Sequence, residues 1–207
     1  MQIIQHRINT CEQLKSTDQK FGVEIDVRYH NDEIVLHHDP FHHHQSPAPE
    51  KFETFLSKYK NEGVLIVNIK TEGIEKECIE LLNRHQIKTW FFLDLSMPYF
   101  VKYALAGSRN EIEGFSKENL AVRFSEYEPI EYALEFRDKA RWIWVDCFEK
   151  CPLDSSVYSL IKDHFKVCLV SPELQKHPKE KIQEFKAQLK DIQIDAVCTK
   201  YPEEWLK

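Results

Sequence analysis

Short apolar runs recur along this chain, and amphipathic stretches with helical spacing separate most of them. Eight of the runs have the length of strands and are rich in β-branched and aromatic residues. The strands predicted from them are residues 2–6, 22–29, 64–70, 90–95, 120–125, 142–147, 166–170 and 196–199. The predicted helices are residues 50–59, 74–85, 99–106, 130–136, 155–165, 179–189 and a short final 203–207. Strands and helices therefore alternate over nearly the whole chain.

This alternation predicts parallel strands joined by right-handed helical crossovers. Residues 64–67 and 167–170 are nearly all apolar, as expected of strands covered on both faces. Eight strand–helix units predict a compact α/β fold, a TIM (β/α)8 barrel, although 207 residues is near the lower limit for that fold. An open doubly wound sheet is the alternative. The length favours one domain over residues 1–207.

The second strand is followed by a turn and another extended run, residues 33–37, where a helix would otherwise be expected. If His30 and Glu33 pair across the turn, His38 falls opposite Ile25. The small β-hairpin predicted here therefore returns His38 to the mouth of the barrel.

Polar residues two apart occur on the second and third predicted strands, so each pair shares a strand face. Glu24 and Asp26 form one pair, and Asn68 and Lys70 form the other. Two carboxylates inside a barrel are costly unless they are compensated, and a divalent cation is the simplest compensation. Asn68 can add a carbonyl oxygen to such a cation, and Lys70 can hold a phosphate oxygen. The alternative is a solvated strand face and a polar strand end.

Two histidines are expected beside these carboxylates, because His6 ends the first strand and His38 follows the hairpin arm. Histidines can share the roles of base and acid near neutral pH, although a lone histidine is more often structural. Arg7 can neutralise a phosphate by a bidentate contact. Together with the carboxylates and Lys70, these residues are the groups that a metal-assisted enzyme acting on a phosphate ester needs.

Later strand ends add four candidate substrate contacts, since barrel sites draw on several strand ends. They are Asp94, Arg123, Glu126 and Asp146, and each is equally compatible with a structural role. His42, His43 and His44 are adjacent and precede the proline-containing residues 45–49. Because neighbouring residues in an extended segment point in different directions, a solvated loop is favoured there over a metal site.

Composition limits the function classes. The net charge of -6 argues against a nucleic-acid binder that works by bulk charge. The sequence shows no signal peptide at its start and no apolar run long enough for a membrane span. The six cysteines are scattered, with Cys147 and Cys151 as the only close pair, so reduced thiols in a cytoplasmic protein are expected. The chain starts at its first predicted strand and stops just after its last, which is compatible with a piece of a longer protein.

The sequence resembles the glycerophosphodiester phosphodiesterase superfamily over essentially its whole length, and most specifically over its first third. The matching segments are His6-Arg7, residues 22–27, residues 35–40, Asn68-Ile69-Lys70 and residues 197–202. Residues 92–96, 123–128, 144–146 and 170–174 resemble a compact bacterial branch of that superfamily.

The resemblance implies a TIM barrel with phosphodiesterase activity that depends on Mg²⁺ or Ca²⁺ and acts on a small-molecule or polymeric phosphodiester. By motif match, His6 and His38 are the acid–base pair, and Arg7 and Lys70 bind phosphate. The metal ligands implied by the match are Glu24, Asp26 and Asn68.

Four departures from the family pattern concern the leaving group more than the reaction. Asn68 stands where a third metal carboxylate is usual, Ile8 where glycine is usual, and Lys200 where an acidic residue often follows the closing threonine. An insertion that commonly builds a glycerol pocket is missing. Glycerophosphodiesters, lysophospholipids and phosphodiester-linked surface polymers all stay open as substrates, and so does the oligomeric state. The alternatives are a non-catalytic barrel that binds a phosphorylated polyol, a lyase that stops at a cyclic phosphate, and a pure interaction domain.

Overall fold

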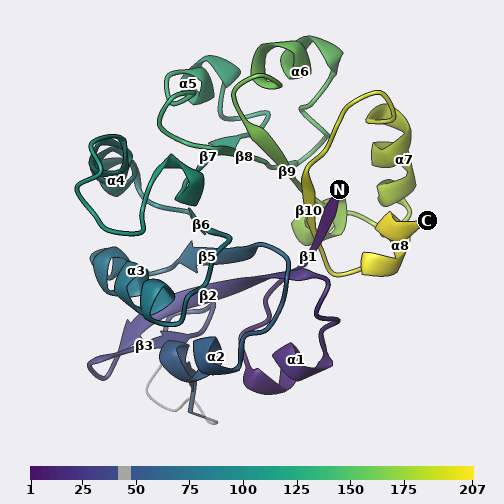
Figure 1. The fold of residues 1–207 in the computed structure, drawn as a ribbon. Coiled ribbons are helices and arrows are strands. Elements are labelled where there is room, and N and C mark those ends of the chain that lie inside the picture. Colours follow the sequence, from purple (N-terminus) through teal and green to yellow (C-terminus); the bar gives the residue numbers. More distant parts are fainter. Residues whose placement is uncertain (42–47) are drawn as a thin grey trace.

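Eight parallel strands form a ring with the helices outside it in the computed structural model, which describes residues 1–41 and 48–207 (Figure 1). The eight are listed with their bounds: β1 (Gln2–Gln5), β2 (Gly22–His30), β5 (Leu65–Ile69), β6 (Trp90–Leu93), β7 (Ala121–Phe124), β8 (Trp142–Val145), β9 (Lys166–Val170) and β10 (Ala196–Thr199). Strand β2 pairs with β1 and β5, and β1 pairs with β10, which continues through β9 and β8 to β7. The predicted TIM barrel is confirmed.

The ring has one weak seam, between β6 and β7. A single parallel bridge joins Phe92 to Leu120 in place of a ladder. Next to it, Nδ2 of Asn119 donates to the carbonyl oxygen of Trp90 at 3.1 Å. A side-chain amide thus replaces part of the missing backbone pairing and satisfies a buried carbonyl.

Eight α-helices and two short 3₁₀ helices are described. They are α1 (Cys11–Ser16), α2 (Phe52–Lys58), α3 (Glu75–Arg84), α4 (Met97–Ser108), η1 (Lys117–Asn119), α5 (Ile130–Leu134), α6 (Ser155–Ile161), η2 (Pro172–Gln175), α7 (Lys181–Gln188) and α8 (Pro202–Leu206). The sequence pattern missed α1, because Leu14 is its one buried residue and gives no apolar period. A capping box between Thr10 and Gln13 begins that helix. Among the described helices, none is both long and apolar enough to cross a membrane.

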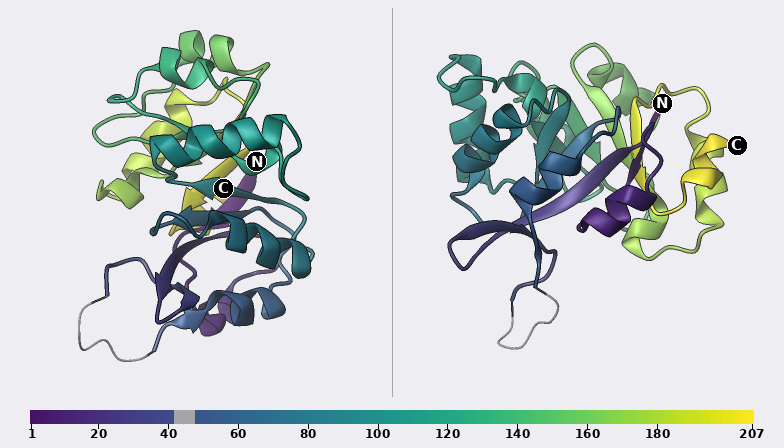
Figure 2. Two further views of the ribbon diagram at one scale, coloured as in Figure 1. Left: turned by 90° about the vertical axis from the view of Figure 1, so that its left-hand side faces the viewer. Right: turned by 60° about the horizontal axis from the view of Figure 1, so that its bottom comes forward.

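The hairpin after β2 is confirmed with its register. Strand β3 (Glu33–Leu36) runs antiparallel to β2 and pairs Glu33 with His30. Asn31 and Asp32 have φ of 49° and 60°, as the two central residues of a type I′ turn require. Figure 2 shows this hairpin projecting from the ring.

The chain after the hairpin differs from the predicted helix at its start. Residues 50–51 were expected in a helix, but they form strand β4 (Glu50–Lys51), which pairs with β3, so the helix begins at Phe52. These residues pair with the backbone of β3, and this pairing depends on a segment outside the local sequence pattern. The solvated loop expected at His42, His43 and His44 lies outside the described residues.

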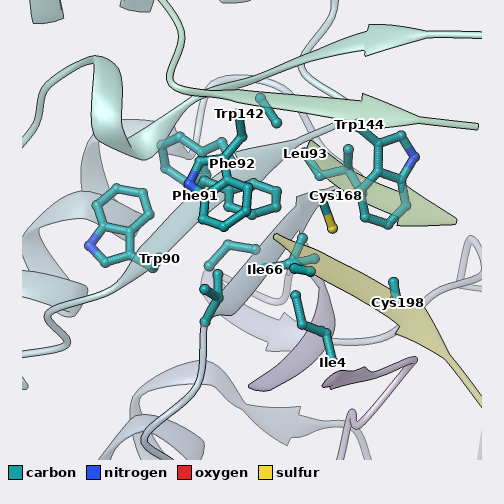
Figure 3. Close-up of a cluster of buried hydrophobic side chains, with 14 of the residues drawn as sticks. Ile4, Ile66, Trp90, Phe91, Phe92, Leu93, Trp142, Trp144, Cys168 and Cys198 are labelled. Atoms are coloured by element: carbon teal, nitrogen blue, oxygen red, sulfur yellow. The ribbon is translucent and has the colours of Figure 1, made fainter. Parts of the chain in front are cut away.

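The core combines aliphatic, aromatic and cysteine side chains, and Figure 3 shows a cluster of them. Trp144 of β8 stands in register with Cys168 of β9, and Phe91 and Trp142 pack with ring centroids 5.0 Å apart. All six cysteines are free. Burial raises the pKa of Cys168 and Cys198, so these thiols serve packing and not nucleophilic chemistry.

Candidate active site

A cavity of about 370 Å³ opens at the end of the barrel where the parallel strands finish. Side chains on or just after β1, β2, β5, β6, β7, β8, β9 and β10 all reach its wall. The wall includes His6, Arg7, Glu24, His38, Asn68, Lys70, Asp94, Arg123 and Asp146. A larger groove of about 650 Å³ lies between the hairpin and α3, but its wall holds none of the predicted site residues. The chemistry therefore gathers at the strand ends, as expected of a barrel.

The two carboxylates of β2 are buried and held by specific donors. Glu24 and Asp26 are 1 % and 0 % exposed. The backbone N–H of Arg7 donates to Oε2 of Glu24 at 2.8 Å, and Nδ2 of Asn68 donates to Oε1 at 3.0 Å. Asn9 contacts Asp26 twice, donating from Nδ2 to Oδ2 and accepting from the backbone N–H through Oδ1, each at 2.8 Å. The carboxylates are thus fixed in place.

Two buried oxygens beside Glu24 have no hydrogen-bond partner among the described residues. They are Oδ1 of Asp26 and Oδ1 of Asn68, and these two residues stand opposite each other in the β2–β5 register. Nζ of Lys70 lies 3.8 Å from the Asp26 oxygen, beyond hydrogen-bond distance. A buried acceptor without a partner destabilises the fold, and a cation that contacts the acceptor would remove this cost.

The donor set fits a hard divalent cation, which prefers oxygen ligands. Burial, and then the negative charge of Asp26, raise the pKa of Glu24 well above its usual range, as expected for a carboxylate pair without its compensating charge. Within residues 1–41 and 48–207, no three His, Cys, Asp or Glu side chains converge as a metal cluster. A cation at this position could take the amide oxygen of Asn68 as a third oxygen donor beside Glu24 and Asp26.

His6 stands next to the carboxylates. Its Nε2 is 3.8 Å from Oε2 of Glu24, and its buried Nδ1 has no partner in the described part of the chain. Burial, followed by the positive charges of Arg7 and Lys200, lowers the pKa of His6 to about 3. The imidazole is therefore neutral at neutral pH and can accept a proton.

His38 is held between a cation and a carboxylate. Its Nδ1 lies 2.8 Å from Oδ1 of Asp39, and because a carboxylate only accepts, Nδ1 carries the hydrogen. Nε2 of the same ring accepts from the guanidinium of Arg7. Arg7 has a φ of 56°, a left-handed backbone conformation that is uncommon for residues other than glycine. This conformation lets Arg7 bond Glu24 through its N–H and His38 through its side chain.

A charged network covers the other half of the cavity. Arg123 donates to Asp94 at 2.6 Å, Glu128 at 3.1 Å and Asp146 at 3.0 Å. Lys70 bonds Asp94 at 3.1 Å and so links this network to the carboxylates of β2. Burial acts to raise the pKa of Asp94, but the charges of Arg123 and Lys70 outweigh it and hold the pKa below its usual value.

The structure brings together ten of the eleven predicted site residues: nine reach the cavity wall, and Asp26 lies buried beside Glu24. Glu126 is the exception, because it is not part of the cavity wall. Its carboxylate accepts from the backbone N–H groups of residues 148–150, which follow β8. In the sequence, a polar residue after a strand looks the same whether its side chain faces the cavity or hydrogen-bonds to a neighbouring loop.

Several residues at or beside the cavity were not predicted as site residues from the sequence. Asn9 follows the first strand by four residues and carries no recognisable motif. Trp144, Phe148, Gln175, Lys176 and Lys200 also reach the wall. The chain segments after β8, β9 and β10 supply most of them, and their shared signal is a position just past a strand end.

Comparisons with known proteins connect this arrangement to a family of solved structures. Neither the protein-family models nor the curated proteins contain a match to the chain. Among solved structures, a glycerophosphoryl diester phosphodiesterase from Parabacteroides distasonis matches with a TM-score of 0.66 and 14 % identity, over 98 % of this chain and 84 % of that one. A glycerophosphodiester phosphodiesterase from Agrobacterium tumefaciens matches with a TM-score of 0.67 and 11 % identity, over the full length of both chains. The chain therefore shares the barrel fold of the glycerophosphodiester phosphodiesterases.

Proposed function

We propose that this protein is a metal-dependent phosphodiesterase of the glycerophosphodiester phosphodiesterase superfamily, which hydrolyses a glycerophosphodiester or a related phosphodiester. One observation carries the proposal: two unpartnered buried oxygens, from Asp26 and Asn68, lie beside a buried Glu24 at the same cavity that two histidines line. The shared fold with two solved phosphodiesterases of that name supports it.

The ligands proposed for Mg²⁺ or Ca²⁺ are Glu24, Asp26 and Asn68. When bound, the cation supplies positive charge against the phosphoryl oxygens and against the charge that develops on them. Asn9 keeps Asp26 in position through its two hydrogen bonds. The amide of Asn68 donates to Glu24 and offers its own oxygen, so it orients one ligand while serving as another.

Arg7 and Lys70 are the proposed phosphate contacts. Both cations face the cavity, and both are near the carboxylates of β2. An anionic phosphodiester bound there would draw the Arg7 guanidinium away from Nε2 of His38, since a phosphate is the stronger acceptor. Substrate binding would thereby expose the ring nitrogen that the reaction needs.

The histidines are proposed to divide the proton transfers. His6 is neutral, so it accepts the proton of the attacking nucleophile, which is water or a neighbouring substrate hydroxyl. Once Arg7 has moved to the phosphate, Nε2 of His38 takes up a proton from solvent and donates it to the leaving alkoxide, and the Asp39 carboxylate at Nδ1 stabilises the positive charge of the ring meanwhile. If a neighbouring hydroxyl attacks first, a cyclic phosphate forms, and water then opens it.

The test is turnover of glycerophosphocholine and of bis(p-nitrophenyl) phosphate with Mg²⁺, Ca²⁺, Mn²⁺ or EDTA. Wild type should release product with a divalent cation and not with EDTA, and His38→Ala should lower kcat by roughly 10²- to 10⁴-fold. His164→Ala is the control, because His164 lies just before β9, at the opposite end of the barrel from the cavity. It should retain wild-type turnover.

Identification of the product separates the remaining alternatives. Phosphomonoester as the final product supports the hydrolase, whereas cyclic phosphate that accumulates would identify a lyase. Absence of release by folded protein that binds both a divalent cation and glycerol 3-phosphate would refute the enzyme and support a binding barrel.

A further inference from the structure

Two large aromatic side chains lie exposed on the rim of the cavity. Tyr127 follows β7 and is 65 % exposed, and Phe148 follows β8 and is 38 % exposed. Their ring centroids are 6.1 Å apart, and Phe148 reaches the cavity wall. Adjacent exposed aromatic rings at the edge of a polar cavity indicate a contact surface, because their exposure gives nothing to the fold.

This aromatic pair is fixed before any ligand arrives. The Glu126 carboxylate accepts from three consecutive backbone N–H groups, those of residues 148–150. The hydroxyl of Tyr127 donates to Oε1 of Glu149 at 2.6 Å. Glu126 thus ties the chain after β7 to the chain after β8. Preorganisation of this kind reduces the entropy lost on binding, which favours a ligand-binding role for the rings.

A set of hydrogen-bonding polar groups lines the same cavity as Phe148. The guanidinium carbon of Arg123 is 6.0 Å from the centroid of Phe148. Arg123 bonds Asp94 and Asp146, and Gln175 donates to Asp146 at 2.8 Å. These carboxylates retain lone pairs that can accept from hydroxyl groups, while the guanidinium and the amide can donate to them.

The ligand chemistry that matches both features is a ring with apolar C–H faces and hydroxyls at its edge. We propose that the part of the cavity bounded by Arg123, Trp144 and Phe148 binds a sugar or cyclitol ring in the alcohol portion of the phosphodiester. The inference rests on the proposed function, since the phosphodiester must lie against His6, Arg7 and Glu24 for its alcohol to reach this side. One ring face lies on the aromatic pair, and the ring hydroxyls bond Asp94 and Asp146.

Two other leaving groups fit less well. An acyl chain would cover the charged Arg123 and Asp146 without hydrogen-bonding them, which is costly. A trimethylammonium group binds over aromatic faces, but Arg123 already places a cation near the ring of Phe148. The polar and aromatic groups together therefore select a hydroxylated ring.

The test compares glycerophosphoinositol with glycerophosphocholine as substrates, for wild type, Phe148→Ala and Leu160→Ala. Leu160 is a matched control, because it is 51 % exposed on α6, which lies outside the ring of strands. Wild type and Leu160→Ala should prefer glycerophosphoinositol by about tenfold or more in kcat/KM. Phe148→Ala should lose about tenfold with glycerophosphoinositol and less than about twofold with glycerophosphocholine. Equal kcat/KM for the two substrates in wild type, or equal losses in the variant, would overturn the inference.

A binding experiment keeps this result separate from the activity. Calorimetry would measure binding of myo-inositol 1-phosphate and of glycerol 3-phosphate to wild type and Phe148→Ala, with circular dichroism to verify folding. Tighter binding of the ring phosphate, reduced about tenfold in the variant, supports the subsite even if no diester is hydrolysed. Equal affinities for the two phosphates in wild type, or equal losses for both in the variant, would overturn it.

Discussion

Asn68→Asp tests whether the two unpartnered oxygens form a cation site. The substitution adds a third carboxylate beside Glu24 and Asp26, and it removes the donor that bonds Oε1 of Glu24 at 3.0 Å. Loss of a charge-assisted hydrogen bond costs about 1.5–3 kcal/mol, and repulsion between buried carboxylates adds to this. In EDTA, at a pH where Glu24 is ionised, the free energy of unfolding should therefore fall by about 3–5 kcal/mol.

A divalent cation should stabilise Asn68→Asp more than it stabilises wild type. A third carboxylate supplies negative charge that the amide lacks, and a tenfold tighter Kd adds about 1.4 kcal/mol of stabilisation at saturating cation. Because about 1 kcal/mol shifts the Tm of a domain this size by roughly 2–4 °C, differential scanning fluorimetry resolves both effects. The variant should have the lower Tm in EDTA and the larger rise in Tm with Mg²⁺ or Ca²⁺.

Asn119→Asp is the matched control. Asn119 is also buried and also donates through Nδ2, but its acceptor is the carbonyl oxygen of Trp90 at the β6–β7 seam. It should lose stability in EDTA and gain no more from a cation than wild type does. If Asn68→Asp likewise gained no more than wild type, the assignment of Asp26 Oδ1 and Asn68 Oδ1 as cation ligands would be refuted.

Three further predictions follow from the site. Burial and Asp26 raise the pKa of Glu24 to about 8, so Glu24 keeps its proton in the folded state, whereas the unfolded chain releases it near pH 4.5. The free energy of unfolding in EDTA should therefore fall as pH rises from about 4.5 to 8, which a series of urea midpoints would measure. A rise in that window, or the same slope in Glu24→Gln, would contradict the assignment. Asn9→Ala removes both contacts between Asn9 and Asp26, so it should lower the free energy of unfolding in urea by about 1–3 kcal/mol. It should also weaken cation binding in calorimetry. Unchanged cation affinity would show that Asn9 does not position Asp26. Arg123→Ala should lower the free energy of unfolding by about 2–4 kcal/mol, because it leaves Asp94, Glu128 and Asp146 without their shared partner. Arg109→Ala removes a single exposed pair with Glu111 and should change the free energy of unfolding by no more than about 0.5 kcal/mol. Equal losses would refute a special role for the network.

The strands and the hairpin could be predicted from the sequence because the information is local. The alternation of Glu24 and Asp26 with apolar neighbours places both carboxylates on one face of β2, and the turn before Glu33 fixes where His38 lies. Barrel closure was predicted from the number of strands, and the structure confirms it. The weak pairing of β6 with β7 was not predicted, because it depends on Asn119, which acts on a strand 29 positions earlier.

The roles of individual polar residues were harder to predict for the same reason. Asn9 and Glu126 each bond backbone or side-chain groups that are distant in sequence, at Asp26 and at residues 148–150. Neither residue lies in a periodic pattern that would indicate its partner. A strand-end polar residue can be assigned only when the neighbouring chain segment is placed, which requires the tertiary structure.

The order of the site residues along the chain has a consequence for how specificity can change. Every residue proposed to handle the phosphate or the protons lies before residue 71, on or just after β1, β2, β5 or the hairpin, whereas the proposed ring contacts begin at Asp94. The boundary falls between β5 and β6, so reaction chemistry and leaving-group recognition occupy two uninterrupted stretches of the gene. A recombination or graft that exchanges only the later stretch could give a new substrate preference while the reacting groups are inherited intact.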